Sequence, residues 1–185
     1  IMGMGIPATA AYIIVATVSA PLLTQLGASV LVAHMFAFFY AALSNITPPV
    51  ALASFAAAGL AGASPNKVSV TAVRLGITGF LIPYFFLFNP VLLFDGGTVL
   101  DSIIALVTAS IGVVALASGL QGWLIGRSNA IQRILMIGGG LTLIAPQVWL
   151  DFVGLAIIVI VYVWQKVKPD KSTPAVKGKE VEPTV

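Results

Sequence analysis

The sequence predicts an all-α integral membrane protein, and three observations support this prediction. Hydrophobic residues make up 59% of the chain and charged residues only 8%, with a mean hydropathy of +1.07. A soluble domain carries roughly 25% charged residues, because its surface faces water. No acidic or basic residue occurs before Lys67, and apolar stretches follow one another as far as Trp164. The medium that suits this chain is therefore lipid.

The basic residues are concentrated near the carboxy terminus. Six of the nine lie at or after Arg133, and the run from Lys166 to Val185 is polar. No basic stripe interleaved with aromatic residues is present, so we expect no nucleic-acid partner. Residues 166–185 are rich in Lys, Pro, Thr and Glu, which predicts a disordered tail whose basic residues rest on membrane lipid.

Four stretches after Pro65 are candidates to cross a hydrocarbon core, which takes roughly 20 residues of helix. The charges between them alternate, with basic residues at every second connection and acidic residues at the others. Under the positive-inside rule the basic connections and the tail are cytoplasmic. The expected spans are residues 75–92 with a kink at Pro83, 102–124, 134–149 and 150–165.

The first apolar run covers residues 8–20 and is interrupted by Pro21. Pro7 suits the first turn of a helix, where its missing N–H costs nothing. A run of this length measures roughly 20 Å, which is too short to cross the core and suits one arm of a re-entrant hairpin. The alternative is a full span from Ala8 to Leu26 kinked at Pro21, and length alone favours neither.

Residues 28–62 contain no charge, yet one straight helix of that length would measure roughly 52 Å. In the middle lie Thr47, Pro48 and Pro49. The two prolines remove two N–H donors and push Thr47 out of the α region, so we expect a discontinuous transmembrane helix. Broken backbone at membrane depth is tolerated where it lines a cavity or is buried in protein.

Two segments, residues 3–9 and 44–49, could therefore form a binding site without charged side chains. Helix N-termini suit an anion, and unwound carbonyls and helix C-termini suit a cation such as sodium. The alternative is that these glycines and prolines serve only helix packing and kinks. The candidate sodium- and substrate-binding residues are Gly3, Gly5, Thr9, Ser44, Asn45 and Thr47, with Pro7, Pro48 and Pro49 as helix breakers.

Catalysis is poorly supported. The chain has no Cys and one histidine, His34, whose neighbours Met35 and Phe36 indicate a packed or interfacial residue. No set of residues typical of a transition-metal site is present. We therefore expect no catalytic residue, no cofactor and no transition metal.

The segments Gly3-Met4-Gly5-Ile6-Pro7-Ala8-Thr9 and Ser44-Asn45-Ile46-Thr47-Pro48-Pro49-Val50-Ala51 resemble the large membrane subunit of the TRAP (tripartite ATP-independent periplasmic) transporters, in the fused-permease form. The resemblance covers residues 1–93. It implies that Gly3–Thr9 forms the tip of the second re-entrant hairpin and that Ser44–Pro49 faces it across a sodium site. The family often has Gly where this chain has Ala51.

The resemblance implies an elevator-type permease that imports a small organic anion, such as a carboxylate, with sodium. The expected partners are a periplasmic solute-binding protein, the upstream part of the permease with its small-subunit region, and membrane lipid. The expected location is the bacterial or archaeal inner membrane, as a multi-pass carboxy-terminal fragment. The expected units are the transport domain (1–93), a helical extension (94–165) and the tail (166–185).

Two other classes of protein remain open at this point. A structural or assembly subunit would use its glycines for helix packing only and would show no ion dependence. An intramembrane enzyme would need catalytic residues from elsewhere. The sequence does not identify the solute, the sodium stoichiometry, or a role for the extension.

Overall fold

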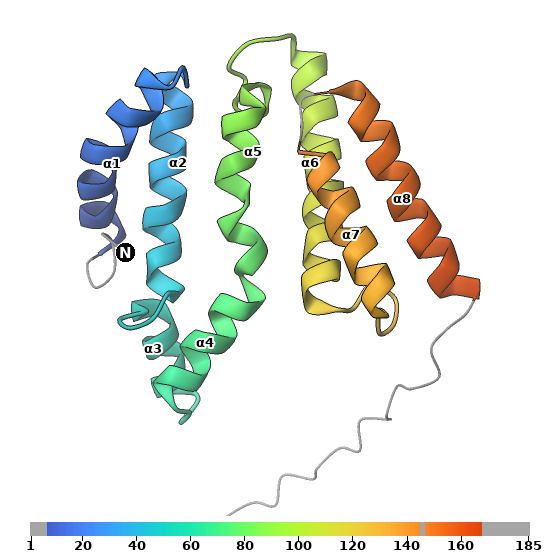
Figure 1. Ribbon diagram of the computed structural model, residues 1–185. Coiled ribbons are helices and arrows are strands. Elements are labelled where there is room, and N and C mark those ends of the chain that lie inside the picture. Colours follow the sequence, from blue (N-terminus) through green and yellow to red (C-terminus); the bar gives the residue numbers. More distant parts are fainter. Residues whose placement is uncertain (1–6, 145–146, 168–185) are drawn as a thin grey trace, which may run out of the picture.

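The computed structural model describes residues 7–144 and 147–167, and this part of the chain is helical (Figure 1). The candidate residues Gly3 and Gly5 and residues 168–185 of the expected tail lie outside the described residues, whereas Lys166 and Val167, expected to begin the tail, belong to the last helix. The α-helices are α1 Ala8–Gln25, α2 Val30–Leu43, α3 Leu52–Leu60, α4 Pro65–Leu75, α5 Ile82–Phe88, α6 Val99–Gln121, α7 Ala130–Thr142 and α8 Val148–Val167, and the 3-10 turns are η1 Ser44–Ile46, η2 Ile77–Phe80 and η3 Pro90–Leu93.

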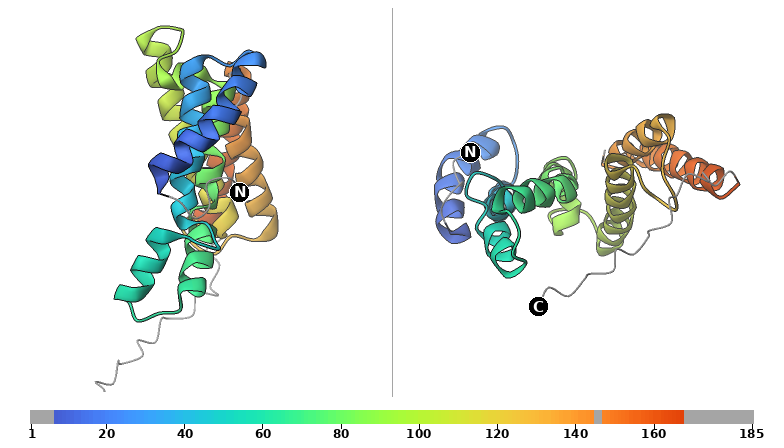
Figure 2. Two further views of the ribbon diagram at one scale, coloured as in Figure 1. Left: turned by 90° about the vertical axis from the view of Figure 1, so that its left-hand side faces the viewer. Right: turned by 90° about the horizontal axis from the view of Figure 1, so that it is seen from below.

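The helices form two groups that lie side by side. Helices α1 to α5 make one group and α6 to α8 the other, with α5 between α2 and α6 (Figures 1 and 2). Helices α3 and α4 extend beyond the rest at one end of the molecule. Many large apolar side chains face outward, including Leu26, Leu60 and Trp149, as expected for a protein surrounded by lipid.

Within the described ranges, three helices are long and apolar enough to cross a membrane: α1, α6 and residues Trp149–Val167 of α8. A fourth span results if α4 and residues Ile77–Phe88 are taken together as one broken span, in which the two segments meet at a bend of 61°. The expected spans at 102–124 and 150–165 correspond to α6 and α8. The expected span at 75–92 is only part of the bent span, and the bend lies at Gly76 rather than at Pro83, because Pro83 occupies the first turn of α5, where its missing N–H costs nothing. All-α membrane architecture is confirmed.

The expected span at 134–149 is wrong in position and length. Helix α7 begins at Ala130, ends at Thr142 and has 13 residues. It starts early because Asn129 and Gln132 form a reciprocal capping box, in which Gln132 Oε1 accepts from the Asn129 N–H at 3.0 Å. At roughly 20 Å, α7 is too short to cross the hydrocarbon core by itself.

Of the two alternatives for the first apolar run, the structure has the longer helix rather than a short arm that ends at Pro21. Helix α1 continues through Pro21 to Gln25, giving 18 residues. Pro21 removes only the hydrogen bond to the Thr17 carbonyl, and apolar packing on α2 outweighs that loss. A helix of this length measures about 27 Å, so the argument from length for a re-entrant arm no longer holds.

The break in the second apolar stretch is confirmed. Helix α2 ends at Leu43, η1 adds one turn to Ile46, and α3 begins at Leu52. The sequence indicated a second arm beginning at Pro48, but the chain takes four more residues to resume a helix. Ala51, the residue before α3, has a left-handed backbone with φ 38° and ψ 55°.

The connections between helices gather at two opposite ends of the molecule. The α1–α2 and η3–α6 connections and the first turn of α8 lie at the upper end of Figure 1, and the α3–α4 and α6–α7 connections and the last turn of α8 at the lower end. The upper group includes Asp95 and the lower group Arg127 and Lys166. The alternation of charge in the sequence therefore becomes a separation of charge in space.

Close glycine contacts hold α6, α7 and α8 together. A methyl group added at Gly140 of α7 would lie 2.7 Å from Leu116 Cγ and 2.9 Å from the Gly112 carbonyl oxygen, both on α6. One added at Gly154 of α8 would lie 2.8 Å from the Gly139 carbonyl oxygen. Small residues at these points let the helix backbones approach closely, as in many membrane helix pairs.

Candidate functional site

Helices α1 and α2 form an antiparallel pair with a seam of small residues. Ala11, Ala16 and Ala20 of α1 are buried, as are Ala33 and Ala37 of α2. One side-chain hydrogen bond crosses this seam, because the Tyr12 hydroxyl lies 2.9 Å from Nδ1 of His34. The pair therefore has a polar connection within an otherwise apolar contact.

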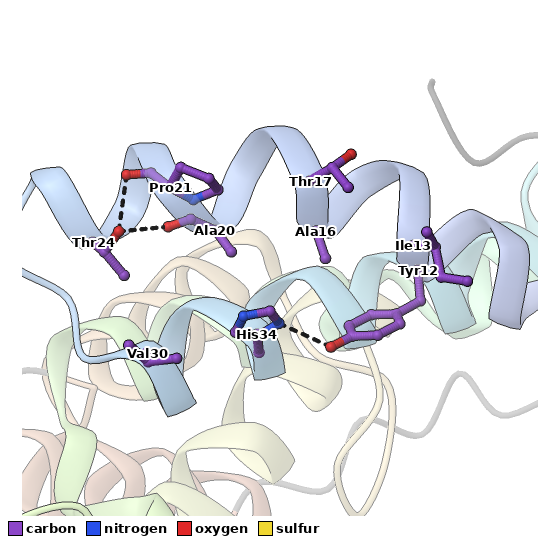
Figure 3. A pocket seen from close by; sticks show the side chains of 9 residues that line it. All are labelled: Tyr12, Ile13, Ala16, Thr17, Ala20, Pro21, Thr24, Val30 and His34. Atoms are coloured by element: carbon purple, nitrogen blue, oxygen red, sulfur yellow. Dashed lines mark hydrogen bonds between the residues drawn. The ribbon is translucent and has the colours of Figure 1, made fainter.

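Two grooves lie between α1 and α2, and Tyr12 and His34 line both of them. The larger, of about 550 Å³, runs along Ala16, Ala20 and Pro21 towards the α1–α2 connection (Figure 3). Figure 3 shows the tyrosine hydroxyl and the imidazole pointing toward one another. The smaller groove, of about 390 Å³, is lined by the predicted site residue Thr9 together with Ala8, Leu31, Met35 and Phe38.

The break after α2 places the other predicted site residues on one turn. Ser44 Oγ donates to the Ala41 carbonyl at 2.6 Å, Asn45 Nδ2 to the Ala42 carbonyl at 3.2 Å, and Thr47 Oγ1 to the Leu43 carbonyl at 2.8 Å. Each side chain uses its donor on the last turn of α2. The oxygen lone pairs of Ser44 and Thr47 and the amide oxygen of Asn45 remain available as acceptors.

The backbone of the break also has a carbonyl oxygen that could bind a cation. In a helix the Asn45 carbonyl would accept from the residue three or four positions ahead, but these are Pro48 and Pro49, which have no N–H. The neighbouring carbonyls do have backbone partners. The Ser44 carbonyl accepts from the Thr47 N–H at 3.1 Å, and the Thr47 carbonyl accepts from the Ala51 N–H at 3.2 Å. The two prolines thus leave the Asn45 carbonyl without a helical partner.

The structure brings the first helix toward the break. Helix α1 contacts η1, and because α1 and α2 are antiparallel and joined at the opposite end, the N-terminal part of α1 lies nearest to it (Figure 1). Pro7, the predicted helix breaker, immediately precedes α1. Among the described residues no hydrogen bond joins Thr9 to the break, so the two segments are neighbours that do not share a direct polar contact.

The turn η2 packs behind the break. A methyl group at Gly76 would lie 3.0 Å from Ile46 Cδ1, and one at Gly79 would lie 3.4 Å from Leu43 Cδ2. Tyr40 Oη donates to the Phe80 carbonyl at 2.8 Å. The position of the break therefore depends on how residues 76–80 are held.

Sequence reasoning missed three polar side chains near these elements. It interpreted His34 as a packed residue, whereas His34 is hydrogen-bonded to Tyr12. Two buried hydroxyls, those of Ser54 on α3 and Thr78 on η2, have no hydrogen-bond partner in the described part of the chain. What could have identified these three residues is that each is a polar side chain within an apolar stretch of sequence. Polar side chains inside a membrane are costly and often functional.

No residue in the described ranges belongs to a cluster of three or more His, Cys, Asp or Glu that could hold a metal ion. The residues at and around the break are uncharged, so any ligand there would be bound by neutral oxygens, N–H groups and helix dipoles. This defines the class of the chain: an all-α membrane protein with a discontinuous helix beside a second helix.

Comparison with known families identifies the chain more closely. Residues 1–96 match the family model described as "Tripartite ATP-independent periplasmic transporter, DctM component". The match covers slightly more than half of the chain, which therefore belongs to this family of TRAP transporter permease components. Residues 97–185 lie outside the match. No curated protein matches, and no solved structure matches.

Family membership places the chain among the permease components of a family of secondary transporters. It also implies a periplasmic binding protein and further permease subunits as partners, and a multi-pass location in the inner membrane. These statements follow from the family and from the apolar helices.

Proposed function

We propose that this chain carries half of the transport site of a sodium-coupled importer of a small organic anion, a carboxylate, delivered by a periplasmic solute-binding protein. The single observation behind the proposal is the broken helix, α2–η1–α3, in contact with α1 inside the region that matches the DctM family. We assign residues 1–93 to the transport domain, 94–165 to an extension and 166–185 to a cytoplasmic tail.

The sodium ion is proposed to bind at the break. Sodium is a hard cation that prefers oxygen ligands, and unwound carbonyls with half-helix C-termini are the usual ligands in discontinuous helices. The Asn45 carbonyl, the Asn45 amide oxygen and the Thr47 hydroxyl supply three such oxygens from one turn. The C-terminal end of α2 adds the negative end of its helix dipole. Gly3, Gly5 and Thr9 are proposed to complete the site from the side of α1.

The anion is proposed to bind beside the sodium ion, at the start of α3. No side chain caps this helix, because its N-cap residue is Ala51, so its first backbone N–H groups lack a capping partner. These groups and the positive end of the α3 dipole favour a carboxylate. Binding of sodium and of the solute then strengthen each other by the same factor, which couples the two fluxes.

The orientation of the permease follows from the separation of charge. The end that contains Arg127 and Lys166 is proposed to face the cytoplasm, and the end that contains Asp95 the periplasm. The periplasmic end would then receive the solute from the binding protein. Upstream permease segments and membrane lipid are proposed to cover the outward-facing apolar side chains.

The experiment is uptake into proteoliposomes that contain the complete permease with its other subunits. The matching binding protein is added outside with a labelled organic acid. We expect uptake with an inward sodium gradient and little uptake when potassium replaces sodium at the same ionic strength. A structural or assembly subunit without its own transport site would give equal uptake in both cations, and this result would contradict the proposal.

A further inference from the structure

The span made of α4, η2 and α5 changes direction by 61° near Gly76. A bend of this kind frees carbonyls that a straight helix would use. The Gly76 N–H still reaches the Ala72 carbonyl at 2.8 Å, but the Gly79 N–H bonds the Gly76 carbonyl at 2.8 Å instead of Leu75. In residues 7–144 and 147–167 no backbone N–H outside the regular helices bonds the Arg74 or Leu75 carbonyl.

A side chain of the extension, residues 94–165, donates hydrogen bonds to these two carbonyls. Gln121, the last residue of α6, donates from Nε2 to the Arg74 carbonyl at 2.8 Å and, at a longer 3.5 Å, to the Leu75 carbonyl. Both contacts are exposed, and they give hydrogen-bond partners to carbonyls that the bend takes out of the helical pattern, so a donor at this point lowers the free energy of the bent form relative to a straight one. Gln121 belongs to the part of the chain that lies outside the DctM match.

The end of α6 that carries Gln121 is itself held in place. Arg133 of α7 donates from Nε to the Gly119 carbonyl and from Nη2 to the Leu120 carbonyl, both at 3.0 Å. A methyl group at Gly119 would lie 2.7 Å from Ile137 Cγ1, so α6 and α7 are in close contact there. The last turn of α6 is thus fixed from the α7 side while its final side chain reaches α4.

The other end of α6 is joined to the same span. Helix α6 contacts η2, at the bend, and η3, the turn that follows α5, so it meets the chain on both sides of α5. The capping box of Thr98 and Asp101 fixes where α6 begins, with Thr98 N–H donating to Asp101 Oδ2 at 2.8 Å. Helix α6 therefore acts as a brace between the bend and the turn that follows α5.

The bend leads directly to the proposed site. Gly76 packs on Ile46 of η1, the turn that precedes Thr47, and Gly79 packs on Leu43 at the end of α2. From this chain of contacts we infer that the extension positions the broken helix, with Gln121 as the positioning residue that holds the Arg74–Gly76 bend against η1. This inference rests on the proposed function for its effect on transport, and the bend itself can be measured without transport.

The test uses a matched pair of substitutions in the complete permease. Gln121→Met keeps the length of the side chain and removes the donor, whereas Gln121→Lys restores a donor of similar reach. These 185 residues contain no Cys, so in a permease whose other segments carry no Cys, spin labels can be placed at Val70→Cys on α4 and Phe88→Cys on α5, where both native side chains are more than half exposed. Double electron–electron resonance between them reports the bend, and sodium activation of uptake reports the site.

We expect Gln121→Met to lengthen or broaden the Val70–Phe88 distance distribution and Gln121→Lys to restore the parent distribution. We also expect Gln121→Met to raise the sodium concentration for half-maximal uptake by up to about five-fold, the factor that one hydrogen bond of about 1 kcal/mol represents. An unchanged distance distribution would overturn the brace. A changed distribution with unchanged sodium activation would overturn the positioning role, even if the transport proposal holds.

Discussion

The Tyr12 hydroxyl lies 2.9 Å from Nδ1 of His34, and this contact joins the first helix of the chain to the helix that breaks beside it. Tyr12 also packs edge-on against Phe38, with ring centroids 6.2 Å apart. The hydrogen bond and the aromatic contact both hold α1 against α2, while the grooves on either side leave room for other groups.

Replacing Tyr12 with Phe should lower stability by about 1 kcal/mol or less, because the ring contact stays and only one hydrogen bond is lost. The measurement is the thermal unfolding midpoint in detergent. The matched control is Tyr162→Phe on α8, where the side chain is 46% exposed. If both substitutions lower the midpoint equally, the Tyr12–His34 bond contributes nothing specific.

Neighbouring glycines of α7 provide a second prediction. Gly140→Ala should destabilise the protein by about 1–3 kcal/mol, because the new methyl group would meet Leu116 and the Gly112 backbone. Gly138→Ala should be neutral or stabilising, since nothing lies within 4 Å of that position and Ala favours a helix. Thermal unfolding of the two variants separates the outcomes. Equal effects would contradict the packing of α6 on α7.

Ala51 provides a third prediction, at the residue before α3. Its φ of 38° lies in the left-handed region, which costs roughly 1–2 kcal/mol for a residue with a Cβ atom. Ala51→Gly should therefore stabilise the protein, and Ala51→Val should destabilise it. A chemical denaturation midpoint that falls for the glycine variant would argue against this backbone conformation.

The orientation of the helices is tested by labelling. Single cysteines replace Val99, at the start of α6, and Ala63, in the α3–α4 connection, since the native chain has none. An impermeant maleimide applied to whole cells should label Val99→Cys from outside and Ala63→Cys only after the membrane is permeabilised. Labelling of both positions from the same side would rule out the proposed topology.

The sequence was sufficient to predict those features that depend on covalent chemistry and composition. Pro48 and Pro49 have no N–H, so the helix had to end before them, and it does. The low charge predicted a membrane protein, and the alternation of Lys67, Asp95 and Arg127 anticipated the separation of charge between the two ends.

Features that depend on packing between distant elements could not be predicted in the same way. Length alone did not decide whether the first helix ends at Pro21 or passes through it, and the seam of alanines with α2 keeps α1 intact. The partners Tyr12 and His34 are 22 positions apart in the chain, and Gln121 and Arg74 are 47 apart, so neither pair follows from local pattern. The early start of α7 was available in principle, because Asn129 and Gln132 have the spacing of a capping box.

The domain boundaries at 93 and 165 and the sodium ligands stay predictions. The structure places Ser44, Asn45 and Thr47 together on one turn, yet bringing residues together does not identify what they bind. Their donors point back to α2, which leaves acceptor oxygens for a cation, and this is the physical basis for the central claim.

The most direct measurement of that claim is the sodium dependence of uptake in Thr47→Val and Asn45→Ala variants of the complete permease. Thr47→Val keeps the shape of the side chain and removes its oxygen, and Asn45→Ala removes the amide oxygen. Uptake into proteoliposomes is measured against sodium concentration with the binding protein present, and Thr17→Val, on the exposed face of α1, is the matched control. We predict that both site variants insert normally but need several-fold more sodium than the parent and the control. Sodium activation identical to that of the parent in both would show that these side chains are not ligands and that the Thr47–Pro49 segment is only a kink.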